Sequence, residues 1–443
     1  MGNSGLRVLL LSASREHFPE PVFPLGAAYV ASALLREGAQ VRVFDAGSTP
    51  FPLRSLRRAL ERFRPDIVGL SLRNVDNAAY PRSRCYLPGY VRIACEVRAS
   101  SRAALFLGGS AFSIFPEELM RLLRAEGGAT GDGEDGILRL LRGEEGPILR
   151  GRLDGLDSVG FPRGIRSVFP GIDRYRVIGV QTTRGCPQSC IYCTYPILEG
   201  DALRARDPEA VADDLAFLSR EHGKRDYFFV DSIFNADEGH MERVCRAILS
   251  RNLPVRFTCH LRPAVSDPSL FGLLARAGCR SVEFGTDSGS DRILSSLAKG
   301  FSADDIRVAS DACRKARIDF CHYLLFGGPG ESADTVAETA RLMDETKPKA
   351  VVAMTGLRIY PRTNLHRIAV QEGILQPDDS LLGPRHYFPR GDPSWLLAKV
   401  GEIAGRRRNW FLPGRRDWSR AMAPRLLRLI HPARPLWRTF RQP

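Results

Sequence analysis

The chain has 443 residues, too many for one ordinary hydrophobic core, so we expect two folded domains followed by an extension. Its hydrophobic fraction of 44% and charged fraction of 26% are typical of soluble globular proteins. No apolar run approaches the length of a membrane span, and the apolar stretch at residues 6–12 is too short for a signal peptide. We therefore exclude an integral membrane protein and expect a cytoplasmic one.

Residues 1–149 alternate short apolar runs with helical stretches, a pattern typical of a parallel sheet flanked by helices. We expect five strands, at residues 7–12, 41–45, 67–71, 104–108 and about 128–131. The predicted fold class is a Rossmann-like, doubly wound α/β domain with its ligand crevice at the carboxyl ends of the strands. No G-x-G-x-x-G follows the first strand, so the ligand is expected to be something other than NAD.

After a linker at residues 150–174, the same alternation starts again and runs through residues 175–373. Strands are expected at residues 177–183, 227–231, 255–260, 281–286, 320–326 and 351–358. Six successive βα units are two short of a closed eightfold barrel. They predict a partial (βα)6 barrel of the TIM type, with the active site at the carboxyl ends of its strands.

Three cysteines, Cys186, Cys190 and Cys193, follow the first barrel strand with the spacing C-x3-C-x2-C. One loop can present these thiolates to a single iron-sulfur cube and leave its fourth iron without a protein ligand. A structural zinc site is the alternative, but it needs a fourth ligand and usually a second C-x2-C pair, which the chain lacks. We expect a 4Fe-4S cluster here, and reduced thiols at the seven scattered cysteines.

With an aromatic residue, Tyr192, before its last cysteine, this motif resembles that of the radical S-adenosylmethionine enzymes. From about residue 6 to residue 372, the chain resembles the cobalamin-binding branch of that superfamily. The resemblance implies that a reduced cluster cleaves S-adenosylmethionine to a 5'-deoxyadenosyl radical. It also implies that the N-terminal domain binds cobalamin and that most characterised relatives then transfer a methyl group.

The resemblance also suggests residues that contact S-adenosylmethionine at the ends of the barrel strands. Asp231, Ser232 and Asn235 lie where the family binds the methionine amine, although Asp-Ser at a strand end is commonly a helix cap. Arg262 could pair with the methionine carboxylate, and a surface salt bridge is the alternative. The candidates for the ribose and the adenine are Thr286, Asp287, Ser288, Gly327, Gly328 and Pro329.

For cobalamin, we expect contacts at the strand ends of the first domain. The candidates are Ser71, Asn74, Gly108, Gly109, Gly131, Gly133 and Glu134. Each lies at or just after a predicted strand, where the crevice of a doubly wound sheet opens. A methylthiotransferase is a less favoured alternative, because it would hold a second cluster on three N-terminal cysteines and only Cys85 and Cys95 precede the motif.

The extension, residues 374–443, is basic and contains all four tryptophans. From residue 385 onward it has fourteen Arg and Lys against three acidic residues, which gives +11 of the net charge of +14. Short amphipathic segments of this composition suit an anionic membrane surface at the inner face of the membrane. The alternatives are that the tryptophans pack on the barrel, or that the segment binds a phosphate backbone, and nucleic acid is not the expected partner.

The resulting expectation is a radical enzyme that methylates an unactivated carbon of a hydrophobic, lipid-like or natural-product substrate. A reductant such as flavodoxin or ferredoxin would supply its electron. Within the class, the alternative is a cobalamin-dependent cyclisation or rearrangement without methyl transfer. Outside it, the alternative is a membrane- or nucleic-acid-binding protein with a structural or sensory cluster.

Overall fold

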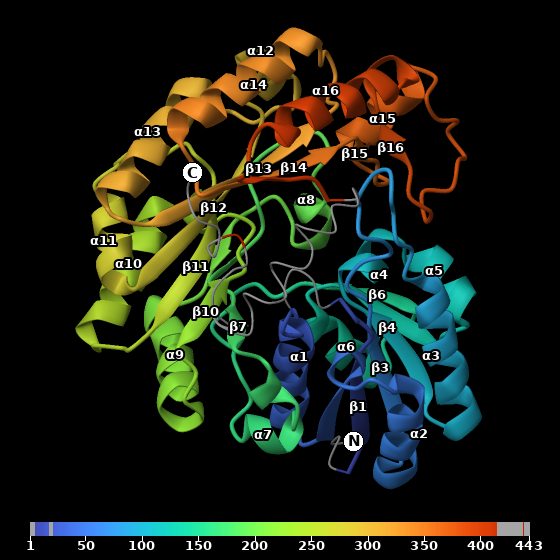
Figure 1. The fold of residues 1–443 in the computed structure, drawn as a ribbon. Helices are drawn as coiled ribbons and strands as arrows, with labels where there is room; N and C mark the ends of the chain where they lie inside the picture. The colour runs from blue at the N-terminus through green and yellow to red at the C-terminus, as the bar shows by residue number, and fades with distance from the viewer. Residues whose placement is uncertain (1–4, 17–20, 414–436, 438–443) are drawn as a thin grey trace.

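The computed structural model describes residues 5–16, 21–413 and 437. Two parallel sheets dominate the fold, and helices cover both (Figure 1). No helix within these ranges is long and apolar enough to cross a membrane. The segments predicted for membrane contact lie partly in residues 414–436, which are outside the described residues.

The first sheet has six strands in the order β2-β1-β3-β4-β5-β6, all parallel. Its strands are β1 (Arg7–Ser12), β2 (Gln40–Asp45), β3 (Ile67–Ser71), β4 (Ala104–Gly108), β5 (Gly127–Gly131) and β6 (Ile148–Gly151). Its helices are α1 (Leu25–Arg36), α2 (Pro52–Phe63), α3 (Leu87–Ser100), α4 (Ser110–Ile114), α5 (Pro116–Leu123) and α6 (Gly133–Leu141). The doubly wound domain is confirmed, and β6 is an additional edge strand that the sequence analysis missed.

The second sheet has seven strands in the order β17-β14-β13-β12-β11-β10-β7. They are β7 (Val177–Val180), β10 (Asp226–Phe229), β11 (Arg256–Leu261), β12 (Cys279–Asp287), β13 (Asp319–Phe326), β14 (Ala350–Thr355) and β17 (Trp410–Phe411). Its helices are α9 (Pro208–His222), α10 (Glu238–Ser250), α11 (Leu270–Ala277), α12 (Asp291–Ser296), α13 (Ala303–Lys315), α14 (Ala333–Thr346), α15 (Asn364–Gln371) and α16 (Ser394–Gly405). In the described part, β7 and β17 are unpaired with each other, so the barrel is open.

Two predicted barrel strands are shorter than expected because a turn interrupts each of them. The first ends at β7, and β8 (Thr183–Arg184) pairs instead with β9 (Arg204–Ala205). The last ends at β14, and β15 (Leu357–Arg358) pairs with β16 (His386–Tyr387). Gly356, with φ of 79°, makes the second break, since few other residues adopt this conformation. Two short helices, α7 (Ile165–Val168) and α8 (Tyr195–Leu198), lie before and after β7 and β8 in the chain.

Local sequence signals account for many element boundaries. Ser302 and Ser332 begin α13 and α14 with reciprocal capping boxes, in which each side chain accepts a bond from a backbone N–H of the first turn. Asp207 and Asp237 cap α9 and α10 with a single bond, in which the carboxylate accepts from a backbone N–H of the first turn. These caps satisfy orphan donors and fix where the helices of the barrel start.

The carboxyl ends of the two sheets meet. Arg358, at the end of β15, donates to Asp76, in the loop after β3, over 3.0 Å, and both side chains are buried. Arg362 donates to the backbone oxygens of Ser113 and Ile114 in α4. The crevice edge of the first domain therefore faces the mouth of the barrel (Figure 1).

We predict that Arg358→Met destabilises the protein by about 3 to 5 kcal/mol, because it leaves the buried Asp76 carboxylate without its counter-charge. The measurement is the midpoint of chemical unfolding. The control is Arg57→Met, which breaks the exposed pair with Glu96 and should leave the midpoint nearly unchanged. Equal shifts for the two variants would contradict the structural role given to Arg358.

Candidate active site

The three predicted ligand cysteines lie in one loop between β8 and α8, at the mouth of the barrel. Cys186 is 4% exposed, Cys190 and Cys193 are half-buried, and all three are free thiols. The Cys186 N–H donates to the carbonyl of Gly200 and the Cys193 N–H to that of Cys190, both over 3.1 Å. The loop is thus folded back on itself, with its thiols on one short stretch of chain.

The start of the loop is fixed at Gly185. Its φ is 92°, and an added Cβ would lie 2.2 Å from the carbonyl oxygen of Ala202, so only glycine fits. Its N–H donates to a carboxylate oxygen of Glu199 over 3.0 Å, and its carbonyl accepts from the Ser232 hydroxyl over 3.0 Å. Ser232, a predicted cofactor contact, therefore supports the cysteine loop directly.

The far side of the loop is fixed at Ile191. Its N–H donates to the carbonyl of Leu297 over 3.2 Å, and its carbonyl accepts from the Leu365 N–H over 2.7 Å. These bonds join the loop to the end of α12 and the start of α15. The protein alone therefore holds the loop backbone in place on both sides.

A buried ion pair lies beside the cysteines. The Lys299 ammonium is 2.6 Å from a carboxylate oxygen of Asp287 and donates to the Tyr192 hydroxyl over 3.2 Å. Tyr192 in turn donates to Asp287. Burial alone would lower the pKa of Lys299, but Asp287 more than offsets this and the pKa is raised. Two predicted residues, Tyr192 and Asp287, are thus brought together around a lysine that stays charged.

Sequence reasoning missed Lys299. It lies in the run Ser296-Leu-Ala-Lys299-Gly300, which looks like an ordinary helix end with a surface lysine. No signal in the sequence identifies it, because only the fold brings the Lys299 ammonium next to Asp287. In the structure, Lys299 is 7% exposed.

Burial raises the pKa of Cys193 to about 12 and also raises the pKa of Cys190. The Lys299 cation acts on both thiols in the opposite direction. Metal binding requires thiolates, so a fixed positive charge at this point favours the ligating form. The electrostatics of the loop therefore suit a group that carries several thiolate ligands.

Within the described ranges, no three His, Cys, Asp or Glu side chains are grouped so that they could hold one metal ion. A cubane cluster does not need such a group, because each thiolate binds a different iron. The donor set is three cysteines from one loop, which leaves one corner of a cube without a protein ligand. These residues fit a 4Fe-4S cluster better than a zinc ion.

Asp231, predicted to contact the methionine amine, is completely buried. Its carboxylate accepts three hydrogen bonds, from the N–H and hydroxyl of Thr182 and the N–H of Thr183, over 2.6 to 2.8 Å. Burial raises the pKa of Asp231 to about 6, although these hydrogen bonds favour the charged form and act in the opposite direction. Asp231 thus anchors the strand that leads into the cysteine loop.

Asn235 and Arg262 connect neighbouring strand ends. The Asn235 amide accepts from the Arg262 N–H and donates to the carbonyls of Arg262 and Ala264. The Arg262 guanidinium donates to the carbonyls of Lys299 and Gly300, over 3.2 and 2.8 Å. Arg262 therefore holds the turn that carries Lys299, and it forms no surface salt bridge among the described contacts.

Thr286 and Ser288 point away from the barrel mouth. Thr286 shares a 2.6 Å hydrogen bond with Nδ1 of His322, and Ser288 one of 3.0 Å with the Thr339 hydroxyl, all of them buried. These two side chains fix the shape of the strand end around Asp287. Of the three consecutive residues predicted here, Thr286, Asp287 and Ser288, the structure places only Asp287 next to the cysteine loop.

The turn after β13 contains the predicted adenine contacts Gly327, Gly328 and Pro329. Gly327 has φ of 108°, and its N–H donates to Glu331 over 3.1 Å. An added Cβ on Gly328 would lie 2.9 Å from the Leu297 side chain. Gly327 is therefore favoured by its backbone conformation and Gly328 by its close packing on Leu297, and Pro329 is half-buried.

The predicted cobalamin contacts gather along one edge. Ser71 and Gly108 are paired in register at the ends of β3 and β4, and Gly131 ends the adjacent β5. An added Cβ on Gly109 would meet the Leu72 backbone at 2.6 Å, so that glycine has a packing role. The side chain of Asn74 is exposed. Gly133 begins α6 after this edge.

Buried charges join this edge to the cysteine loop. Arg184, two residues before Cys186, donates to both oxygens of Glu134, over 3.1 and 2.6 Å, and to Asp132 over 3.0 Å. Arg204 donates to Asp132 over 2.5 Å. Burial would raise the pKa of Asp132, but Arg204 and then Arg184 lower it overall. The sequence analysis missed Arg184 and Asp132, and it assigned Glu134 to the cofactor.

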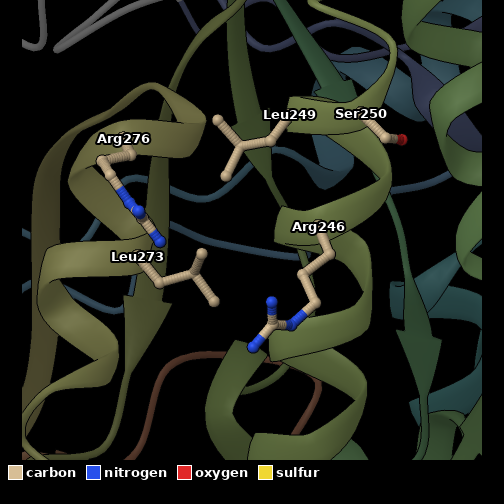
Figure 2. A pocket seen from close by; sticks show the side chains of 5 residues that line it. All are labelled: Arg246, Leu249, Ser250, Leu273 and Arg276. Atoms are coloured by element: carbon tan, nitrogen blue, oxygen red, sulfur yellow. The ribbon is translucent and has the colours of Figure 1, made fainter.

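A separate hollow lies on the outside of the barrel, between α10 and α11. Figure 2 shows that the side chains lining it come from these two helices and that each helix contributes one arginine. The residues that line it are Arg246, Leu249, Ser250, Leu273 and Arg276. None of them belongs to the strand ends or to the cysteine loop, so the hollow is not part of the candidate active site.

These features define a class of enzyme in which a cluster-binding loop at the mouth of an open barrel faces the crevice edge of a doubly wound domain. Residues 180–343 match the radical SAM superfamily, and residues 13–141 match the B12 binding domain. The chain belongs to the cobalamin-binding radical S-adenosylmethionine enzyme superfamily. The predicted fold class agrees with this assignment.

Relatives match over most of the chain. An uncharacterized methyltransferase from Pyrococcus horikoshii is 25% identical, over 80% of this chain and 79% of its own length. Tryptophan 2-C-methyltransferase from Streptomyces laurentii is 24% identical, over 82% of this chain and 74% of its own length. The structure of the radical S-adenosylmethionine methyltransferase TsrM from Kitasatospora setae, with cobalamin and a [4Fe-4S] cluster bound, has a TM-score of 0.78 at 22% identity and 93% coverage of both chains. The fold is therefore shared along nearly the whole length.

We predict that Lys299→Met destabilises the protein by about 3 to 5 kcal/mol, since it leaves the buried Asp287 carboxylate without its counter-charge. The double variant Lys299→Met with Asp287→Asn should recover a large part of this loss, because no buried charge remains. The measurement is a double-mutant cycle of unfolding free energies. Additive effects of the two substitutions would contradict the pairing.

Proposed function

We propose that this enzyme transfers a methyl group to a carbon atom of a small organic molecule and uses a 4Fe-4S cluster, S-adenosylmethionine and cobalamin. The observation that carries the proposal is the placement of the cysteine loop. Arg184, at its start, is bonded to Glu134 and Asp132 of the other domain, so the loop faces the crevice edge of the doubly wound sheet. Two cofactors bound at these two positions would share one space.

The relatives support this choice of reaction. The matches from Pyrococcus horikoshii and Streptomyces laurentii are both methyltransferases by name, and the second acts on tryptophan. TsrM is a methyltransferase whose structures contain cobalamin, a [4Fe-4S] cluster and an S-adenosylmethionine analogue. Methylation of a natural-product-like substrate is therefore favoured over a cyclisation or rearrangement.

Cys186, Cys190 and Cys193 would hold the cluster. Bound together, the cluster, S-adenosylmethionine and cobalamin supply electron transfer and methyl transfer, which protein side chains cannot perform. The chain itself holds the loop rigid through Gly185 and Ile191, and it places the Lys299 cation beside the thiolates. Asp231 is buried, and it supports the cysteine loop through its hydrogen bonds with Thr182 and Thr183.

We place cobalamin at the carboxyl ends of β3, β4 and β5, beside Ser71, Asn74, Gly108 and Gly131. The fit rests on the exposed Asn74 amide and on the small residues along this edge, which let a large planar group approach the backbone. Glu134 would act through Arg184, because both of its oxygens are bonded to that guanidinium.

Two partners complete the proposal. A small electron carrier such as flavodoxin or ferredoxin would reduce the cluster. The apolar residues of α16, among them Leu396, Val400 and Ile403, are buried on the barrel, so this amphipathic helix does not offer them to a membrane. A small-molecule substrate needs no such contact, and it is the substrate class that we favour.

The test is anaerobic reconstitution followed by turnover with methyl-labelled S-adenosylmethionine, hydroxocobalamin and excess dithionite, which supplies the electrons that reduce the cluster and the cobalt. Wild-type protein should bind about four irons and four sulfides per chain and should transfer label to cobalamin. Cys190→Ala should lose both properties, whereas Cys95→Ala, which removes an exposed thiol of the first domain, should keep both. Label transfer by Cys190→Ala at the wild-type rate would contradict the proposed function.

A further inference from the structure

Trp437 is the one residue described beyond position 413, and it is buried inside the protein. Its side chain is 6% exposed and packs against Cys321 and Ala350, with Tyr323 and Phe411 around it. Burial raises the pKa of Cys321 well above its ordinary value, so this thiol is uncharged where Trp437 packs against it. A residue from the basic extension thus reaches the barrel sheet.

The ring lies on the inner face of that sheet. On β13, His322 faces the helices, since its Nε2 shares a 3.3 Å hydrogen bond with Ser310 of α13. Neighbouring side chains on a strand point to opposite faces, so Cys321 and Tyr323 face the inside of the barrel. Trp437, which packs on Cys321, therefore occupies the interior of the barrel.

The indole is held by a carboxylate. Its Nε1–H donates to one oxygen of Glu283 over 2.9 Å, and the other oxygen lies 3.7 Å from Nδ1 of His260. Glu283 is nearly buried, and among the described residues the indole N–H is the one hydrogen-bond donor joined to it. A buried carboxylate without a donor is strongly destabilising, so this position demands an N–H or a cation.

Aromatic rings lie beside Glu283 on the neighbouring strands. The half-exposed His260 packs its ring on Phe228, with centroids 4.9 Å apart, and lies 6.5 Å from the ring of Tyr323. Glu283 and Asp287 lie four residues apart on β12, so roughly 13 Å of strand separates Glu283 from the residue beside the cysteine loop. A ligand anchored at Glu283 can therefore extend toward the candidate cluster site.

We propose that Glu283, with the rings of His260 and Phe228, is a recognition site for a planar aromatic group that carries an N–H donor. Trp437 is its built-in occupant, which an incoming ligand displaces. The inference rests on the proposed function in one respect, because it identifies that ligand as the methyl acceptor. Recognition of an N–H by a buried carboxylate would reject analogues that lack the proton, since they leave the carboxylate unpaired.

The test uses the full chain with 5-fluorotryptophan at its four tryptophans, and the ¹⁹F signal of Trp437 is assigned from Trp437→Phe. Indole should move this signal from its buried position to that of a solvent-exposed ring. The control ligand is 1-methylindole, which has the same ring without the proton, and it should leave the signal in place. Trp437→Ala should bind indole at least tenfold more tightly than wild-type protein, because no internal occupant competes.

Glu283→Leu is the matched variant that removes the acceptor and keeps a side chain of similar size. It should bind indole and 1-methylindole equally. A Trp437 signal that does not move at indole concentrations that saturate Trp437→Ala would overturn the proposal and make Trp437 a fixed structural plug. These measurements need no cofactor, so their failure would leave cluster binding and label transfer to cobalamin unaffected, and the reverse also holds.

Discussion

The arrangement of the active site depends on one buried interaction, the contact of Arg184 with Glu134 and Asp132. Arg184 belongs to the barrel and starts the cysteine loop, whereas its partners belong to the doubly wound domain. Burial alone would lower the pKa of Arg184, but Glu134 more than offsets this and the pKa is raised. A buried guanidinium with fewer partners would be strongly destabilising, so neither domain can move away without exposing a charge. The cluster site and the crevice edge are therefore held together by electrostatics inside the protein.

Much of the fold was predictable because its signals are local. Each of the five strands predicted for the first domain is observed, since parallel buried strands are continuous apolar runs bounded by turns. The cysteine motif was predictable for the same reason, because Cys186, Cys190 and Cys193 lie within eight positions of one another. The capping serines Ser302 and Ser332 likewise act on residues three positions away.

The features that could not be predicted depend on contacts that only the fold creates. Glu134 looked like a cofactor ligand because it follows a strand, yet its partner Arg184 lies fifty residues later. Lys299 has no local pattern that distinguishes it from a surface lysine, and only the folded strand brings it to Asp287. Asp231 was predicted at the right strand end, but the direction of its side chain follows from the buried N–H groups of Thr182 and Thr183.

An open barrel has two edges, and each presents unpaired backbone groups that must be covered. The first domain covers the β7 edge, where the Tyr29 hydroxyl of α1 accepts a bond from the Gln181 N–H and one hydrophobic core runs from β1 into the barrel. The extension covers the other edge, where β17 pairs with β14 and Trp410 is fully buried. Two of the tryptophans that by composition suggested a membrane surface, Trp410 and Trp437, thus pack on the barrel. The described residues of the extension therefore complete the packing of the barrel, and Trp437 carries this packing into its interior, where the indole N–H is bonded to Glu283.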